Sequence, residues 1–96
     1  MFANSRAIPM GFQQLTTIST ATALTVPTGA NVAVIRAQTQ GCTWRDDGTA
    51  PTATVGIPIL PTDTMPLEYT GNLQALQFIL ITAGAILNVS YYFLRT

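Results

Sequence analysis

Apolar and polar residues alternate along this chain in short runs, and turn residues separate the runs. In the run 31–40, residues 33, 35, 37 and 39 fall on one face of an extended chain and residues 32, 34, 36 and 38 on the other. The run 87–93 is similar, with Leu87, Val89, Tyr91 and Phe93 on one face. A period of two residues is typical of half-buried β-strands. We therefore predict two long strands here, the second following a turn at 82–84.

Shorter runs predict further strands. They lie at 11–18, 24–26, 43–45, 67–69 and 76–81, and residues 55, 57 and 59 predict a brief edge strand within a proline-rich connection over 49–66. Turns are expected at 27–29 and 46–48. For 73–81 the alternative is an amphipathic helix, because leucines at 73, 76 and 80 have helical spacing. We favour a strand because 78–81 adjoins a glycine turn and a second strand-like run.

Seven or eight short strands in 96 residues predict a single all-β domain. The expected architecture is a compact β-sandwich or a jelly-roll-like small barrel spanning residues 11–96. Residues 1–10 contain Pro9 and apolar groups without a period. We expect them to form an extended N-terminal arm.

The chain carries few charges: four arginines, four acidic residues, no lysine and no histidine. Charged residues make up 8% of the chain, against about a quarter in ordinary globular domains. A folded chain of this size exposes roughly 5,300 Å², or about 660 Å² per charge. Neutral, weakly charged surfaces associate. We therefore expect other protein to cover much of this surface, in a homo-oligomer (a dimer or trimer) or in contacts with other proteins.

The same composition argues against several other classes of protein, namely nucleic-acid-binding proteins, membrane or secreted proteins, and enzymes. Four scattered arginines, balanced by four acidic residues, do not form the positively charged surface that binds nucleic acids. The most apolar stretch, 78–87, is too short to span a membrane, and no cleaved signal peptide is expected. Without histidine or lysine, acid–base or Schiff-base catalysis lacks its usual groups. We expect neither an enzyme nor a bound cofactor.

The acidic residues and the cysteine fit structural roles. Asp46 and Asp47 are adjacent, so on a strand they would point to opposite faces and could not act as a facing pair of carboxylates. Because aspartates commonly cap turns, we expect Asp46 or Asp47 to cap the turn in preference to binding calcium. Pairing Asp47 with Glu68 would be the alternative for a glycosidase. Cys42 is the only cysteine, so it suits a core position better than a reactive one, and no metal site is expected.

The densest polar cluster is 44–48, with the sequence Trp-Arg-Asp-Asp-Gly. Trp44 belongs either to the core or to an exposed interface anchor beside Arg45, and a carbohydrate stacked on Trp44 is a third possibility. By residue type, we select six candidates for contact with other protein; Tyr91, on the Leu87 face, suits the core better. The candidates are Trp44, Arg45, Asp46, Asp47, Tyr69 and Tyr92.

Three segments, 22–30, 44–53 and 84–92, resemble small β-rich virion proteins encoded by tailed bacteriophages and prophages. The likeness runs from Gly11 onward, and its most specific part is the 44–48 turn followed by Pro51-Thr52-Ala53. It implies a capsid decoration, or cement, protein that binds the major capsid protein or other virion proteins, in a virion assembled in the host cytoplasm. The alternative that it implies is a tail- or fibre-associated module that binds a receptor or glycan. No catalytic residues come with this family. An aliphatic residue is usual where this chain has Cys42, which implies a packing role for the thiol.

Overall fold

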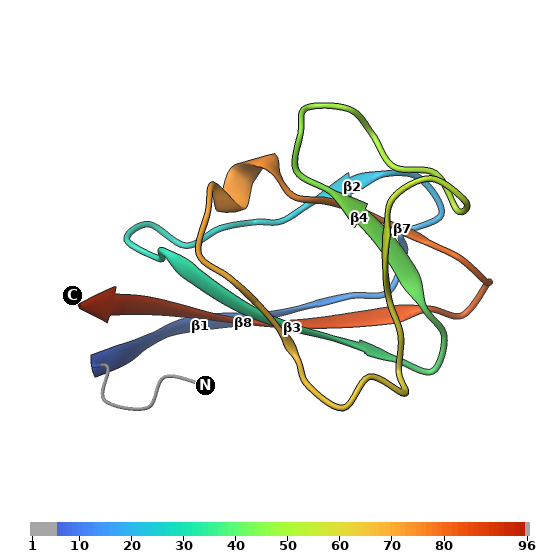
Figure 1. Ribbon diagram of the computed structural model, residues 1–96. Helices are drawn as coiled ribbons and strands as arrows, with labels where there is room; N and C mark the ends of the chain where they lie inside the picture. Colours follow the sequence, from blue (N-terminus) through green and yellow to red (C-terminus); the bar gives the residue numbers. More distant parts are fainter. Residues whose placement is uncertain (1–5, 96) are drawn as a thin grey trace.

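The computed structural model describes residues 6–95, and eight strands and one short 3₁₀ helix make up its regular structure (Figure 1). The elements are β1 (Arg6–Leu15), β2 (Thr22–Ala23), β3 (Val32–Gln38), β4 (Cys42–Arg45), β5 (Ile57–Ile59), β6 (Leu67–Tyr69), η1 (Leu73–Ala75), β7 (Gln77–Leu80) and β8 (Ile86–Arg95). The prediction of an all-β domain of seven or eight strands is confirmed.

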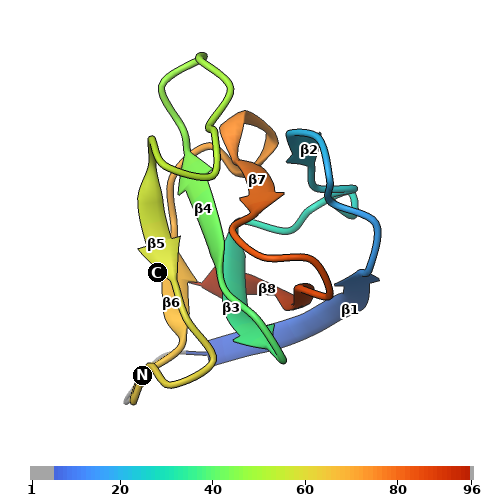
Figure 2. The ribbon, with the colours of Figure 1, turned by 90° about the vertical axis from the view of Figure 1, so that its right-hand side faces the viewer.

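The strands form two antiparallel four-stranded sheets that pack face to face. Sheet A has the order β1-β8-β3-β6 and sheet B the order β2-β7-β4-β5 (Figure 2). Within residues 6–95, only the β4–β5 connection stays in one sheet, and every other connection crosses to the opposite sheet. The sheets are not closed, so the molecule is a β-sandwich and not a barrel.

The core lies between the sheets and follows the predicted alternation. Ala33, Ile35 and Ala37 of β3 face it and are buried, whereas Arg36 faces outward and is exposed. Both sheets and two residues outside the strands, Ile18 and Leu76, contribute the largest fully buried side chains. The fully buried ones are Ile18, Val32, Ile35, Cys42, Leu76, Phe78, Leu87, Val89 and Tyr91. The core position that we predicted for Cys42 is confirmed.

The first strand differs from its prediction. Residues 6–10, which we expected in an arm outside the domain, belong to β1 and pair with the end of β8. β1 tolerates Pro9 because it is an edge strand and because a β-bulge falls at Met10, between Pro9 and Gly11. The domain boundary expected at residues 10 and 11 is therefore wrong for residues 6–10, whereas residues 1–5 lie outside the described residues.

Other predicted strands are shifted or shortened. Leu24 and Val26 follow β2 instead of forming it, although Leu24 is buried. In the stretch 73–81 the favoured strand forms as β7, from Gln77 to Leu80, and the amphipathic helix does not; one turn of 3₁₀ helix, η1, precedes the strand and is capped by the side chain of Asn72. Phe78 is buried, but Ile81 lies beyond the strand and is exposed.

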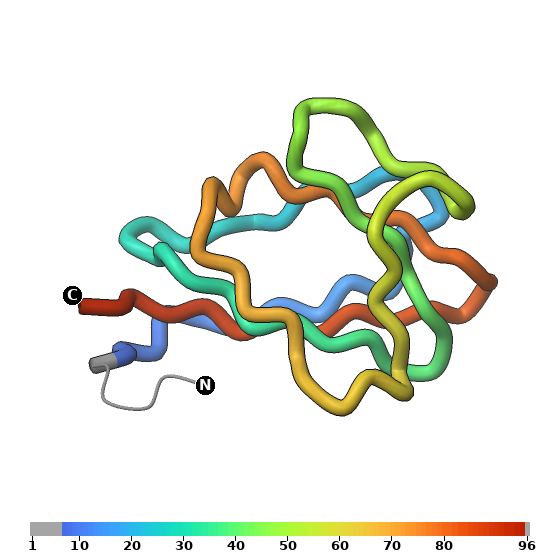
Figure 3. The backbone as a smooth tube through the Cα atoms, viewed as in Figure 1, coloured from blue at the N-terminus to red at the C-terminus, as the bar shows by residue number. Residues whose placement is uncertain are grey.

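The paired ends of β1 and β8 project past the rest of the sandwich, at the left of Figures 1 and 3. The side chain of Asn31 holds this end of β8 in place. Its Oδ1 accepts a hydrogen bond from the Leu94 N–H at 2.7 Å, and its Nδ2 donates to the Leu94 carbonyl at 3.2 Å. Phe93 was expected on the core face, but it is 37% exposed because no facing sheet covers the projecting end.

Candidate functional site

A hollow of about 340 Å³ opens where β4 leaves sheet B and the chain turns back toward β5. We call it the β4–β5 hollow. Its lining combines polar residues of the predicted 44–48 cluster with apolar residues beyond the turn. The lining residues are Trp44, Arg45, Asp46, Asp47, Val55, Gly56 and Ile57.

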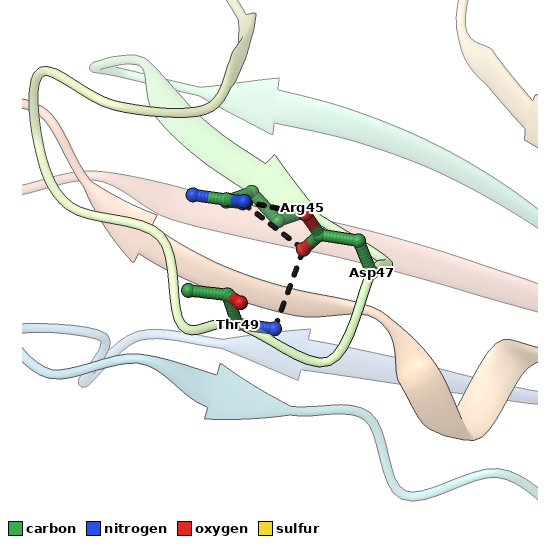
Figure 4. A network of polar contacts seen from close by, with 3 residues as sticks. All are labelled: Arg45, Asp47 and Thr49. Carbon is green, nitrogen blue, oxygen red and sulfur yellow. Dashed lines mark hydrogen bonds and ion pairs between the residues drawn. The ribbon is translucent and has the colours of Figure 1, made fainter.

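Asp47 organises the turn at one side of the hollow (Figure 4). Its Oδ1 accepts hydrogen bonds from the Arg45 Nε at 3.0 Å and from the Thr49 N–H at 3.3 Å, and its Oδ2 pairs with the second arm of the guanidinium. The hydrogen bond from Arg45 is the main cause that lowers the pKa of Asp47 and raises that of Arg45. Gly48 follows with φ +86°, a backbone conformation that suits glycine. The predicted turn is confirmed, with Asp47 serving as its side-chain cap.

Asp46 connects the turn to the opposite sheet. The Tyr69 hydroxyl, on β6 of sheet A, donates a hydrogen bond to Asp46 Oδ2 at 2.6 Å. That bond is the main cause that raises the pKa of Tyr69, followed by burial. The Tyr69 ring also meets Trp44 edge-on, with centroids 6.0 Å apart and an interplanar angle of 78°. Both carboxylates of the cluster therefore have partners within the chain.

The rest of the loop folds back over the outer face of sheet B. Thr43 Oγ1 donates to the Thr52 carbonyl at 2.6 Å, and Pro51 is buried. Gly56, with φ +148°, lies so close to β4 that a Cβ there would be 3.1 Å from both Thr43 Cβ and the Trp44 carbonyl oxygen. This close approach sets the position of the hollow's apolar side, where Val55 is 50% exposed and Ile57 54%.

Five of the six candidates selected from the sequence come together in the structure: Trp44, Arg45, Asp46 and Asp47 line the hollow, and Tyr69 braces it. Tyr92 lies apart, on the outer face of sheet A beside Ser90. Trp44 is 9% exposed and belongs to the core cluster, so the exposed Trp44 beside free carboxylates that glycan stacking requires is not found.

Val55, Gly56 and Ile57 were not selected from the sequence as site residues. The signal for them was the predicted edge strand at 55, 57 and 59. An edge position next to prolines leaves alternate apolar side chains without a covering neighbour. Ile59 faces the core and is buried, whereas Ile57, at the start of β5, is left beside the hollow.

The charged side chains that line the hollow are already paired within the chain. Arg45 and Asp47 neutralise each other, and Asp46 accepts a hydrogen bond from the Tyr69 hydroxyl, which raises the pKa of Tyr69. Cys42 lies in the core, and burial raises its pKa to about 11. Among residues 6–95, no group of three potential metal-ligating side chains occurs. An apolar side chain flanked by a hydrogen-bonding or cationic group would fit this lining.

No helix within the described part of the chain has the length and apolar character needed to cross a membrane. Comparisons of the chain with protein-family models, with curated proteins and with solved structures found no match.

Proposed function

We propose that this protein is a structural component of a phage virion, a capsid decoration protein that stabilises the shell by binding neighbouring subunits. The observation that carries the proposal is the amount of apolar surface left uncovered on a chain with only eight charged residues. Large apolar side chains that are at least one-third exposed are Ile8, Phe12, Val55, Ile57, Leu60, Met65, Ile81 and Phe93. The resemblance of the chain to phage virion proteins supports the same role.

The outer face of sheet A is the surface that best suits contact with a shell. Phe12 of β1 is 65% exposed there, in line with Ser90 of β8 and Val34 of β3. Among the described residues, this face carries two charges, Arg36 and Glu68. An aromatic group in a surface with few charges is typical of protein interfaces.

Side-chain amides make part of this face rigid. Gln14 Nε2 donates to Asn88 Oδ1 at 2.9 Å, and Asn88 Nδ2 donates to Gln38 Oε1 at 2.9 Å, so the three amides link β1, β8 and β3. Because these rotamers are already fixed, little side-chain entropy is lost when a partner covers them. In this proposal, the shell is stabilised because the protein binds only the assembled state.

The proposal is tested by co-sedimentation of the protein with assembled phage capsids. Wild-type protein should sediment with capsids to a saturating copy number and should raise the temperature at which they open. Phe12→Asp should weaken binding about tenfold or more, because an aromatic anchor is lost and a charge is buried. Met65→Asp is the matched control, because Met65 is 66% exposed but lies in the connection between β5 and β6. Absence of wild-type binding, or equal weakening by both variants, would contradict the proposal.

A further inference from the structure

The projecting end of the β1–β8 ribbon presents apolar and cationic side chains together. Ile8 and Phe93 are direct cross-strand partners, and Arg95 lies two residues further along β8, so all three share one face of the ribbon. Ile8 is 47% exposed, Phe93 is 37% exposed, and Arg95 is exposed. We call these three residues the ribbon tip.

The positive charge of the ribbon tip is not neutralised within the described chain. In residues 6–95 the ion pair formed is that of Arg45 with Asp47, so Arg95 has no acidic partner there. An acidic partner for Arg95 would therefore have to come from outside the described chain.

The tip is held in one position before any partner arrives. The two hydrogen bonds between the Asn31 amide and Leu94, together with the bond from the Asn31 N–H to the Tyr92 carbonyl at 2.9 Å, fix the end of β8. A preorganised projection loses less conformational entropy on binding than a flexible one. The ribbon tip is therefore suited to insertion into a recess.

The β4–β5 hollow has the complementary composition. Asp46 and Asp47 outnumber Arg45, so the formal charge of its lining is negative. Its apolar side, Val55 and Ile57, is about half exposed. Its volume of about 340 Å³ lies near the lower limit of ligand pockets, which suits one or two large side chains.

We propose that the ribbon tip of one copy of this chain docks in the β4–β5 hollow of a second copy. Phe93 and Ile8 pack against Val55 and Ile57, and Arg95 approaches Asp46 and Asp47. Charge complementarity favours a second copy, because the unpaired cation and the acidic, apolar recess occur on the same chain. The inference goes beyond the proposed function and depends on no property of a capsid.

The contact joins two different patches, so it is heterologous and generates a closed ring or an open filament. This distinguishes it from a two-fold dimer, in which each patch meets its own copy. The distinction can be tested with variants that each disable one half of the contact.

Three variants separate the two halves. Phe93→Ser/Arg95→Ser disables the tip, Val55→Lys/Ile57→Lys disables the hollow, and Met65→Lys is a control at an exposed apolar site outside both patches. Molar mass is measured by light scattering after size-exclusion chromatography over a range of concentrations, and circular dichroism checks that each variant is folded. Wild type and Met65→Lys should grow in mass with concentration, whereas each double variant should associate at least about tenfold more weakly.

The decisive sample is an equimolar mixture of the two double variants. One intact tip and one intact hollow remain between them, so the mixture should form a species of two chains that grows no further. A monomeric wild type, a mixture that stays monomeric, or a hollow variant that associates as strongly as wild type overturns the inference.

The capsid assay reports on the proposed function separately. A wild type that associates with itself but does not bind capsids contradicts the decoration role and leaves the head-to-tail contact intact. A wild type that binds capsids but stays monomeric at every concentration overturns the head-to-tail contact alone. If the protein is monomeric and the variant with the disabled hollow binds capsids more weakly than wild type, the hollow is occupied by another virion protein. That result also overturns the head-to-tail contact.

Discussion

The Tyr91 hydroxyl donates a hydrogen bond of 2.7 Å to the side-chain oxygen of Gln13, and this bond joins β8 to β1 from the core side of sheet A. The same Gln13 oxygen accepts from the Thr25 N–H at 3.1 Å. Tyr91 is 1% exposed, and burial raises its pKa to about 12. Gln13, on the edge strand β1, therefore supplies the hydrogen-bond acceptor for the hydroxyl of the buried Tyr91.

Removing either partner of this bond should cost stability by different amounts. Tyr91→Phe loses a hydrogen bond and should lower the free energy of unfolding by about 1 kcal/mol. Gln13→Leu leaves the buried hydroxyl without its acceptor and should cost about 2 kcal/mol. Urea unfolding followed by circular dichroism measures both. The double variant should be less destabilised than the sum of the two, and strict additivity would show that the bond contributes nothing.

Cys42 should react slowly with thiol reagents in the folded protein. Burial raises its pKa from 9.0 to about 11, so at pH 8 its thiolate fraction is about a hundredfold lower than in the unfolded chain. Iodoacetamide labelling, followed by mass spectrometry with and without denaturant, measures the difference. Rapid labelling of the folded protein at a rate that does not change with denaturant would contradict the core position.

The same burial makes stability depend on alkaline pH. The folded state holds the protons of Cys42 and Tyr91 more tightly than the unfolded state, so this stability is fully present below about pH 9 and is lost as pH rises toward 11 and 12. The free energy of unfolding should therefore fall with increasing pH above 9. Cys42→Val should make the free energy of unfolding fall less steeply between pH 9 and 11. An unchanged slope in this variant would mean that a group other than Cys42 causes the pH dependence.

Two glycines of the 46–56 loop offer a matched pair of substitutions. Gly48 has φ +86° and open space around it, whereas Gly56 has φ +148° and backbone and side-chain atoms at 3.1 Å from a Cβ. Gly48→Ala should cost about 1 kcal/mol from backbone strain alone. Gly56→Ala adds a steric clash with β4 and should cost about 2 kcal/mol or more. Thermal unfolding compares them; equal losses would mean that the close approach of Gly56 to β4 contributes nothing.

The bond between Tyr69 and Asp46 should hold the turn against β6. Tyr69→Phe keeps the ring beside Trp44 but removes the hydrogen bond, so amide hydrogen exchange should speed up at residues 46–49 while the core strands keep their protection. Asp46→Asn, which retains an acceptor oxygen, should have a smaller effect. Uniformly faster exchange across the molecule would indicate a loss of global stability instead.

The sequence predicted best those elements whose two faces differ in burial. In β3, Ala33, Ile35 and Ala37 face the core and Arg36 faces water, so the period of two residues was visible. β1 was predicted poorly, because proline is usually a sign of a strand end. Only the position of β1 at the sheet edge, and the bulge after Pro9, make that residue acceptable, and neither can be recognised without the partner strand.

The site was predicted in part for a similar reason. The cluster 44–48 is contiguous, so its charges and its turn could be recognised locally, and Asp47 caps the turn as expected. The bond from Tyr69 to Asp46 joins opposite sheets and depends on how the chain crosses between them. The hollow itself depends on the close approach of Gly56 to β4, and no spacing in the sequence reports that contact.

The pairing of β1 with β8 has a consequence for biosynthesis. β1 ends at Leu15, and its neighbour in sheet A among the described strands, β8, begins at Ile86, so β1 leaves the ribosome long before the strand with which it pairs. Loop closure over most of the chain slows folding. During that delay the backbone groups of β1, which carries Ile8 and Phe12, have no partner strand. Nascent chains are therefore prone to pair with one another. Expression at lower temperature, or together with a chaperone that shields extended apolar segments, should raise the yield of folded protein.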